Sequence, residues 1–168
     1  MPLYQGELLE TLLTRRPLLG LEEGRNIAIK LARGAAAVHR AGIIHRDIKP
    51  DNVILEDGGS LKLIDLGAVR VLGLEDFPAD DIPGTPAYMA PEMFAGEPGN
   101  EATDIYALGI TMFRAFTGEF PYGNPDATSP PRRDQPQPLS ACAPICRRGS
   151  RLSSGERSPS IQPNVFTT

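Results

Sequence analysis

The sequence predicts a mainly α fold with one small β-hairpin. Three stretches carry apolar residues at helical spacing, and two short runs of β-forming residues flank an Asp-Gly-Gly turn. The chain has 168 residues, which is enough for one domain that buries a sizeable core. We therefore expect a single core with helices as its main elements.

Two helices are expected in the first quarter of the chain. The first covers residues 7–14, and its leucines fall on one stripe: Leu8, Leu9, Leu12 and Leu13. Pro17 limits it, because proline disfavours the helical conformation at the residue before it. The second covers residues 22–40, where Glu22 and Glu23 suit the positive end of the helix dipole. Ala41-Gly42 then gives a stop signal.

The middle of the chain changes to a strand pattern. Residues 53–55 and 61–64 are rich in β-forming side chains and flank the turn EDGGS, which predicts a hairpin. Residues 67–91 contain turn residues and show no clear period. A last helix is expected over residues 102–117, and because it is apolar on most sides it should be buried.

Composition changes abruptly after Thr128. Residues 1–128 hold 11 basic and 19 acidic side chains, whereas residues 129–168 hold 6 basic and 2 acidic ones with seven serines. We expect a domain over residues 1–128 and a disordered Pro/Ser/Arg-rich tail over residues 129–168. No further His or Cys lies near Cys142 and Cys146 in the sequence, so we interpret this pair as solvated thiols rather than zinc ligands.

Charge and hydropathy exclude several functional classes. The formal net charge is −4, which argues against a general nucleic-acid binder. No apolar run approaches the roughly 18 residues of a membrane span. The first residues lack the basic and apolar regions of a signal peptide. We expect a cytoplasmic protein without a membrane segment.

Four short motifs carry the functional signal. Residues 45–52 read HRDIKPDN and residues 65–67 read DLG; residues 84–92 read GTPAYMAPE and residues 104–109 read DIYALG. In this order and spacing they resemble the C-terminal lobe of a eukaryotic-like, bacterial-type protein serine/threonine kinase. The resemblance covers residues 4–128. The amino-acid sequence of this region is most similar to the kinase half of bacterial bifunctional kinase/phosphatase proteins.

The resemblance implies a phosphoryl-transfer site that works by positioning and charge neutralisation. Asp47 would orient the hydroxyl of a protein serine or threonine, and Lys49 would contact the transferring phosphate of ATP. Asn52 and Asp65 offer the oxygen ligands that Mg²⁺ prefers. Glu7 would match the residue that binds the ATP ribose. ATP and Mg²⁺ are the implied cofactors, and a protein with an accessible Ser or Thr is the implied partner.

Other positions resemble structural residues of the same family. Asp104 resembles the aspartate that accepts hydrogen bonds from the backbone of segment 45–52, and Thr85 resembles the threonine that bonds to Asp47. Glu92 resembles a glutamate whose arginine partner lies in later helices, which the tail does not contain. His45 is expected to pack in the core.

Two further positions need separate interpretation. Lys30 ends a run, IAIK, that imitates the strand lysine of kinases, but we expect it on a helix surface. In the family that the sequence resembles, the arginine at the position of Arg46 usually binds a phosphate group on the activation segment. Because residues 65–92 contain only two hydroxyl side chains, we hypothesise that one nearby carboxylate replaces that phosphate: Glu75, Asp76, Asp80 or Asp81. The alternative is a solvated acidic loop.

The motifs of an N-terminal kinase lobe are missing from the sequence. We therefore expect the chain to begin within the domain, and the tail to reflect a frame shift or a fragmentary gene model, with a genuine disordered tail as the alternative. The function predicted is a serine/threonine kinase segment that transfers the ATP γ-phosphate, weakly or not at all by itself. The alternatives are a non-catalytic pseudokinase-like module that binds a partner and a non-functional gene fragment.

Overall fold

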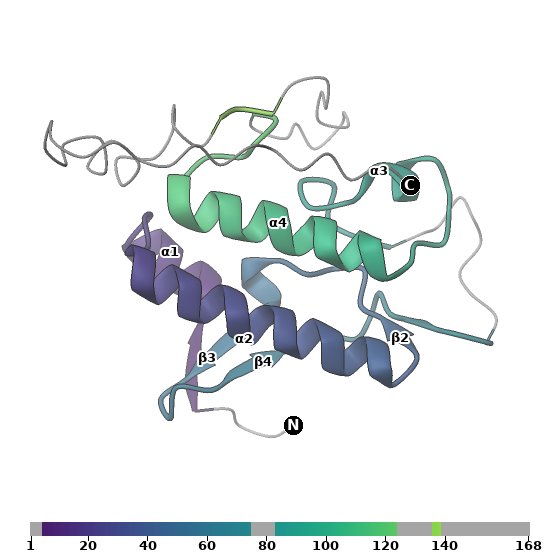
Figure 1. The fold of residues 1–168 in the computed structure, drawn as a ribbon, viewed down its shortest axis with the longest axis horizontal. Helices are drawn as coiled ribbons and strands as arrows, with labels where there is room; N and C mark the ends of the chain where they lie inside the picture. The colour runs from purple at the N-terminus through teal and green to yellow at the C-terminus, as the bar shows by residue number, and fades with distance from the viewer. Residues whose placement is uncertain (1–4, 75–82, 124–135, 139–168) are drawn as a thin grey trace, which may run out of the picture.

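Two long helices lie side by side at the centre of the fold (Figure 1). The computed structural model describes residues 5–74, 83–123 and 136–138. Helix α2 (Leu21–Arg40) packs against α4 (Glu101–Thr117) on one side and against strand β4 (Leu61–Leu63) on the other. The prediction of a mainly α fold with a small antiparallel sheet is therefore confirmed for these residues.

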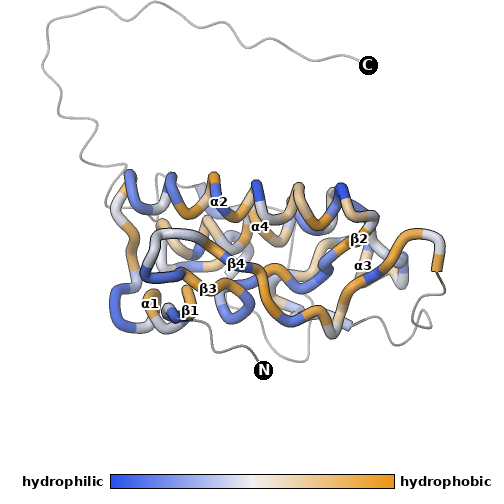
Figure 2. Tube along the Cα trace, turned by 90° about the horizontal axis from the view of Figure 1, so that it is seen from below, coloured by the Kyte–Doolittle hydropathy of each residue, from blue (hydrophilic) through white to orange (hydrophobic). Residues whose placement is uncertain are grey.

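Helix α2 starts one residue before its predicted start and ends where predicted. Its colouring alternates between hydrophilic and hydrophobic positions in Figure 2, as expected of an amphipathic helix. The buried positions are Gly24, Ile27, Leu31 and Ala35. A Cβ atom built on Gly24 would lie 2.2 Å from Cε1 of Phe116, so the absence of a side chain lets Phe116 approach α2.

Helix α4 has a signal at each end. Asn100 caps its first turn, with Asn100 Oδ1 accepting from the backbone N–H of Ala102 at 2.8 Å. At its other end Gly118 adopts φ +74°, the left-handed conformation that commonly closes a helix. The prediction of burial on most sides is only partly right, because the Ile105 side chain is 55% exposed.

The sheet contains the predicted hairpin and one additional strand. Strands β3 (Val53–Glu56) and β4 pair antiparallel, with Val53 opposite Leu63. Strand β1 (Gly6–Leu8) pairs with the other edge of β3. The helix predicted from residue 7 was wrong at its start: residues 6–8 form β1, and α1 covers Leu9–Arg15. A Cβ at Gly6 would lie 2.3 Å from the Leu55 carbonyl oxygen, so this position requires glycine.

The remaining elements are short. Strands β2 (Ile43–Ile44) and β5 (Arg70–Val71) form a separate antiparallel pair, and β5 lies in the segment for which no period was visible. A 3-10 turn, η1 (Pro50–Asn52), precedes β3, and α3 covers Pro91–Phe94. Within the described ranges, no helix combines the length and hydropathy required to cross a bilayer.

The core fills the space between α1, α2, β3 and α4. It is made of aliphatic side chains from all four elements: Leu9, Leu12, Leu13, Ile27, Leu31, Ala35, Val53, Ala107, Ile110 and Ala115. Segment 45–52 runs along this core, because Ile48 and Pro50 are fully buried. The polar residues of the segment are therefore held on a rigid support.

Candidate active site

The carboxylate of Asp47 is the centre of a polar cluster. Lys49 Nζ lies 2.8 Å from Asp47 Oδ2, and Asn52 Nδ2 donates to the same oxygen at 2.9 Å. Thr85 Oγ1 donates to Asp47 Oδ1 at 2.8 Å and accepts from Lys49 Nζ at 2.6 Å. The fold thus brings together three of the five site residues predicted from sequence, and it adds Thr85, whose bond to Asp47 is confirmed.

These contacts determine the charge of Asp47. Burial raises its pKa, since the side chain is only 11% exposed. Hydrogen bonds from Lys49, Thr85 and Asn52 and the positive charge of Lys49 together outweigh burial and hold the pKa below its usual value. Asp47 is consequently an ionised hydrogen-bond acceptor at neutral pH.

Asn52 and Asp65 lie at the same end of the β3–β4 hairpin. The Ile64 N–H donates to the Asn52 carbonyl at 2.9 Å, and Asp65 is the next residue. The Asn52 amide nitrogen donates to the Asp47 carbonyl at 2.8 Å and to its carboxylate, which leaves the Asn52 amide oxygen for another partner. Asp65 is exposed and has a left-handed backbone with φ +63°.

The side chain of Asp65 supports its own turn. Its Oδ1 accepts a hydrogen bond from the Gly67 N–H at 3.0 Å, and the second carboxylate oxygen is left for another partner. Leu66 beside it is 61% exposed. The described part of the chain contains no group of three or more His, Cys, Asp or Glu side chains arranged to hold a metal. A metal here would rest on the Asp65 and Asn52 oxygens.

Glu7, a predicted site residue, does not join the polar cluster around Asp47. It stands on β1 opposite Leu55. Its carboxylate pairs with Arg15 at 3.0 Å, and the two side chains are 37% and 67% exposed. In the described residues Glu7 is therefore engaged by α1 rather than by the Asp47 cluster.

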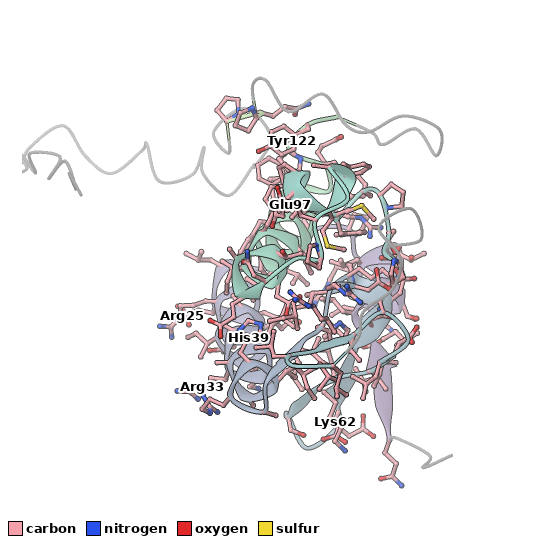
Figure 3. All side chains as sticks on the ribbon, turned by 90° about the vertical axis from the view of Figure 1, so that its right-hand side faces the viewer. Arg25, Arg33, His39, Lys62, Glu97 and Tyr122 are labelled. Carbon is pink, nitrogen blue, oxygen red and sulfur yellow. The ribbon has the colours of Figure 1, made fainter. Side chains whose placement is uncertain are left out.

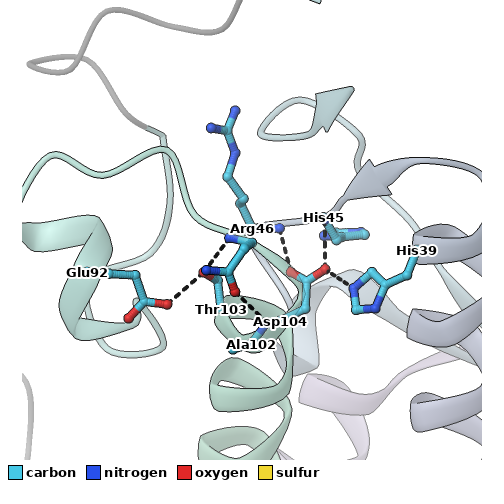
Figure 4. A network of polar contacts seen from close by, with 8 residues as sticks. His39, His45, Arg46, Glu92, Ala102, Thr103 and Asp104 are labelled. Carbon is cyan, nitrogen blue, oxygen red and sulfur yellow. Dashed lines mark hydrogen bonds and ion pairs between the residues drawn. The ribbon is translucent and has the colours of Figure 1, made fainter. Parts of the chain in front are cut away.

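The backbone of segment 45–52 is anchored by a buried carboxylate (Figure 4). Asp104, at 0% exposure, accepts from the Arg46 N–H at 2.7 Å and from the His45 N–H at 2.9 Å. His39 also contacts Asp104. The predicted role of Asp104 is confirmed. His45 is fully buried, as expected of a core residue.

Arg46 connects three segments. Its backbone is left-handed with φ +64°. Its Nε donates to the Ala68 carbonyl at 2.7 Å and its Nη1 to the Pro98 carbonyl at 3.2 Å. Arg70, which the sequence analysis did not single out, donates to the Gly99 carbonyl at 2.9 Å. Both arginines thus hold the loop that precedes α4.

The carboxylates proposed to pair with Arg46 lie outside the described residues, so that hypothesis stays a prediction. Glu92 is half-buried, and its carboxylate accepts a hydrogen bond from Thr103 Oγ1 at 2.7 Å. A threonine therefore donates to the carboxylate for which an arginine partner was expected. Lys30 is exposed on α2 and donates to the Gly59 carbonyl, which confirms its place on a helix surface.

Arg114 supports the segment that carries Thr85, and no motif in the sequence indicates this role. Its guanidinium makes a two-pronged contact with Glu10 of α1 at 2.6 and 2.7 Å, and it donates to the Tyr88 hydroxyl at 2.7 Å. Burial raises the pKa of Tyr88 to about 12, although Arg114 opposes the shift. A lone arginine on a helix gives no local sequence signal for such a contact.

Comparison with known proteins shows which family this chain resembles. The profile of the protein kinase domain matches residues 1–154. The serine/threonine-protein kinase PknK of Mycobacterium tuberculosis is 41% identical over 122 residues, which is 73% of this chain and 11% of PknK. PkaB, a serine/threonine-protein kinase of Streptomyces coelicolor, is 38% identical over 135 residues, covering 73% of this chain and 32% of PkaB.

A second mycobacterial protein, the serine/threonine-protein kinase PknL, is 33% identical over 130 residues, covering 77% of this chain and 33% of PknL. The chain thus spans about a tenth to a third of the length of the curated relatives it matches. The profile match passes the predicted border at Thr128, and that border stays a prediction. Taken with the geometry of segment 45–52, these matches show that the chain belongs to the protein kinase family, among the bacterial-type serine/threonine kinases.

Proposed function

We propose that this chain carries the catalytic segment of a protein serine/threonine kinase, which transfers the γ-phosphate of ATP to a protein hydroxyl. The observation that carries the proposal is the carboxylate of Asp47, held at 2.8 to 2.9 Å by Lys49, Asn52 and Thr85. A buried, ionised carboxylate beside an ammonium group is the arrangement that phosphoryl transfer to a hydroxyl requires.

Each residue of the cluster has a separate task in this proposal. Asp47 accepts a hydrogen bond from the substrate hydroxyl, orients its oxygen and receives the proton as that oxygen bonds to the γ-phosphorus. The bond from the γ-phosphorus to the β-phosphate oxygen of ATP breaks in the same step, and ADP leaves. Its lowered pKa suits this role, because the transition state is loose and little proton transfer is needed early. Lys49 places a positive charge where negative charge develops on the phosphate.

Asn52 and Asp65 fit the Mg²⁺ that accompanies ATP in this family. The amide oxygen of Asn52 and the second carboxylate oxygen of Asp65 are hard donors at one end of the hairpin, and Mg²⁺ is usually held by few protein ligands together with phosphates. When bound, the ion would neutralise phosphate charge. Glu7 is proposed to reach the ATP ribose after exchanging its exposed contact with Arg15.

The substrate is proposed to be a protein with an accessible Ser or Thr, and the cytoplasm is the proposed location because the reaction consumes ATP. The 168 residues contain no Gly-x-Gly-x-x-Gly run. We therefore expect the chain to transfer phosphate weakly or not at all by itself, with the described residues supplying the half of the site that orients the hydroxyl.

A thermal melt of the 168-residue chain, with and without MgATP, tests the proposal. Nucleotide that binds the folded state raises the midpoint by mass action. We expect a rise that disappears when EDTA is added and when Asp65 is changed to Asn. The matched control is Asp51→Asn, because Asp51 is exposed on η1 next to Asn52 and holds no proposed ligand role.

The other outcomes of the melt favour the other functions. A cooperative transition that MgATP does not move would reject the nucleotide site and favour a partner-binding module. A chain without a cooperative transition would favour a gene fragment. Where the midpoint does rise, phosphate transfer to a general protein substrate is measured next, and Asp47→Asn should abolish it while the nucleotide shift remains.

A further inference from the structure

We infer that the outer face of α4 is a docking surface for a later segment of this same chain, residues 139–146. The surface, which we call the α4 groove, is a hollow of about 450 Å³. It is lined mainly by apolar side chains, among them Ile105, Tyr106, Phe113, Pro121 and Tyr122, and by Gly109. The inference goes beyond the proposed function, because neither ATP nor a phosphate acceptor takes part in it.

The α4 groove is open in the part of the chain that the structure describes. The Ile105 side chain is 55% exposed, and a Cβ atom built on Gly109 would lie in open space. Tyr122 and Lys62 lie at opposite ends of the molecule in Figure 3, so the groove lies away from the β3–β4 hairpin. A contiguous apolar surface of this kind marks a contact with another segment or molecule.

The chain itself returns to the edge of the α4 groove after it has left α4. The Gln137 N–H donates to the Pro121 carbonyl at 2.7 Å, and Pro121 lines the groove. In Figure 1 the short yellow-green segment 136–138 lies on the side of α4 opposite α2. This backbone hydrogen bond therefore places the chain beside the groove two residues before segment 139–146 begins.

Segment 139–146 has the composition and the length that the α4 groove requires. It reads LSACAPIC, with six hydrophobic residues in eight, whereas residues 147–168 contain only four in 22. Eight extended residues span roughly 26 Å. The stretch of α4 between Ala102 and Phe113, both of which line the groove, rises by roughly 17 Å. The segment is therefore long enough to cover the groove from Pro121 to the first turn of α4.

Charge complementarity gives the segment a direction along α4. Arg147 and Arg148 follow directly after its apolar residues. Glu101 lies in the first turn of α4 and Glu97 in the loop before it, and both residues are exposed. A segment that runs from Pro121 toward the first turn brings the two arginines to these two glutamates. Apolar contact would then supply the affinity, and the opposite charges would fix the register.

The cysteines of the chain provide the test, because both of them lie in the segment: Cys142 and Cys146. The rate at which the reduced thiols react with iodoacetamide, a neutral reagent, is measured on the full chain under native conditions. A synthetic peptide of residues 137–150 gives the rate of the undocked segment. The ratio of the peptide rate to the chain rate is the protection of the thiols.

A pair of substitutions removes the apolar character of the α4 groove. Ile105→Gln with Gly109→Gln places two polar side chains there, and neither meets a steric conflict, since Ile105 is largely exposed and the Gly109 Cβ lies in open space. The matched control is Ile29→Gln with Gly58→Gln. Ile29 is 40% exposed on α2, and a Cβ at Gly58 also lies in open space, in the hairpin turn.

We expect about ten-fold protection in the parent chain at every protein concentration, because docking within one chain keeps the thiols from the reagent most of the time. The groove variant should react at nearly the peptide rate, and the control should keep the protection. Arg147→Glu with Arg148→Glu should lower the protection about three-fold, relative to a peptide with the same changes. Adding Glu97→Lys with Glu101→Lys should restore it.

Several results would overturn the inference. Thiols that react at the peptide rate in the parent chain are the solvated thiols expected from the sequence. Protection that the groove variant retains places the segment elsewhere, and protection that rises with protein concentration assigns the groove to a second copy of the chain. Insensitivity to the charge reversals overturns the direction of the segment. If the groove variant does not melt cooperatively, Ile105→Gln alone replaces it. No readout requires MgATP, so failure of the proposed function leaves each result interpretable.

Discussion

The hydroxyl of Thr85 lies 2.8 Å from Asp47 Oδ1, and this bond joins two segments that are 38 residues apart. Thr85 at the same time accepts from Lys49 at 2.6 Å. The threonine thus bridges Asp47 Oδ1 and the Lys49 ammonium group, while Lys49 also contacts Asp47 Oδ2 directly. The position of the loop before α3 is therefore coupled directly to the charge at the site.

Thr85→Val should disrupt this coupling. The variant keeps the shape of the side chain, but Asp47 loses a donor and Lys49 loses an acceptor. We expect the free energy of unfolding to fall by about 1–3 kcal/mol, the cost of leaving buried polar groups without partners. Urea denaturation at neutral pH measures the change. Thr14→Val, at an exposed position of α1, should remain within about 0.5 kcal/mol of the parent chain.

The lowered pKa of Asp47 predicts an acid-sensitive contribution to stability. Its pKa in the folded state lies below the ordinary value of 3.8, so folding favours the ionised form. The contribution is complete above the unfolded pKa and is lost as the pH falls through the folded pKa. We expect the parent chain to lose more stability than Asp47→Asn as the pH is lowered below about 4.

Urea titrations at a series of pH values measure that difference. Asp57→Asn, in the exposed hairpin turn, is the control and should follow the parent chain. Parallel curves for the parent chain and Asp47→Asn would show that the contacts of Asp47 do not favour its ionised form.

Two glycines of α2 should respond to alanine in opposite directions. At Gly24 the new Cβ would lie 2.2 Å from Phe116, so Gly24→Ala should destabilise the chain by about 1–3 kcal/mol through overpacking. At Gly34 the nearest atom is Leu63 Cδ1 at 3.6 Å, an ordinary contact. Gly34→Ala should therefore stabilise by up to about 1 kcal/mol, from helix propensity. Thermal melts of both variants measure the changes. Stabilisation by Gly24→Ala would contradict the close approach of Phe116 of α4, and destabilisation by Gly34→Ala would contradict the ordinary contact with Leu63 of β4.

Arg114→Lys should weaken the link between α4, α1 and Tyr88. Lysine keeps the positive charge and loses the two-pronged contact with Glu10 as well as the donor to Tyr88. The Arg114 and Glu10 side chains are 23% and 28% exposed, which moderates the cost to about 1–2 kcal/mol. Arg15→Lys is the matched control, because the Arg15–Glu7 pair is exposed and should contribute little. Equal melting temperatures for the two variants would contradict the prediction.

The elements that sequence predicted well carry their own local signals. Helices α2 and α4 lie within one residue of their predicted bounds, since the apolar pattern of each helix and the end signals of α2 lie within the helix or directly beside it. The β3–β4 hairpin is similar, because its turn and both strands are adjacent. Strands β1, β2 and β5 were missed. Each has two or three residues, and β1 exists only because Leu55 lies opposite Glu7, far away in the chain.

The site residues likewise fall into those that the sequence indicates and those that only the fold brings together. The sequence by itself determined which chemistry is available, because Asp47, Lys49 and Asn52 lie within six residues and keep their order wherever the segment lies. Only the tertiary structure decided how these groups are held: Thr85 approaches from a distant loop, Asp104 accepts from the backbone beside Asp47, and His39 contacts Asp104. Such partners are single polar residues on separate elements. Thr85 and Asp104 could be predicted only through the motifs GTPAYMAPE and DIYALG that contain them, and nothing local marks His39. Tertiary packing brings each of the three to within hydrogen-bond distance of its partner.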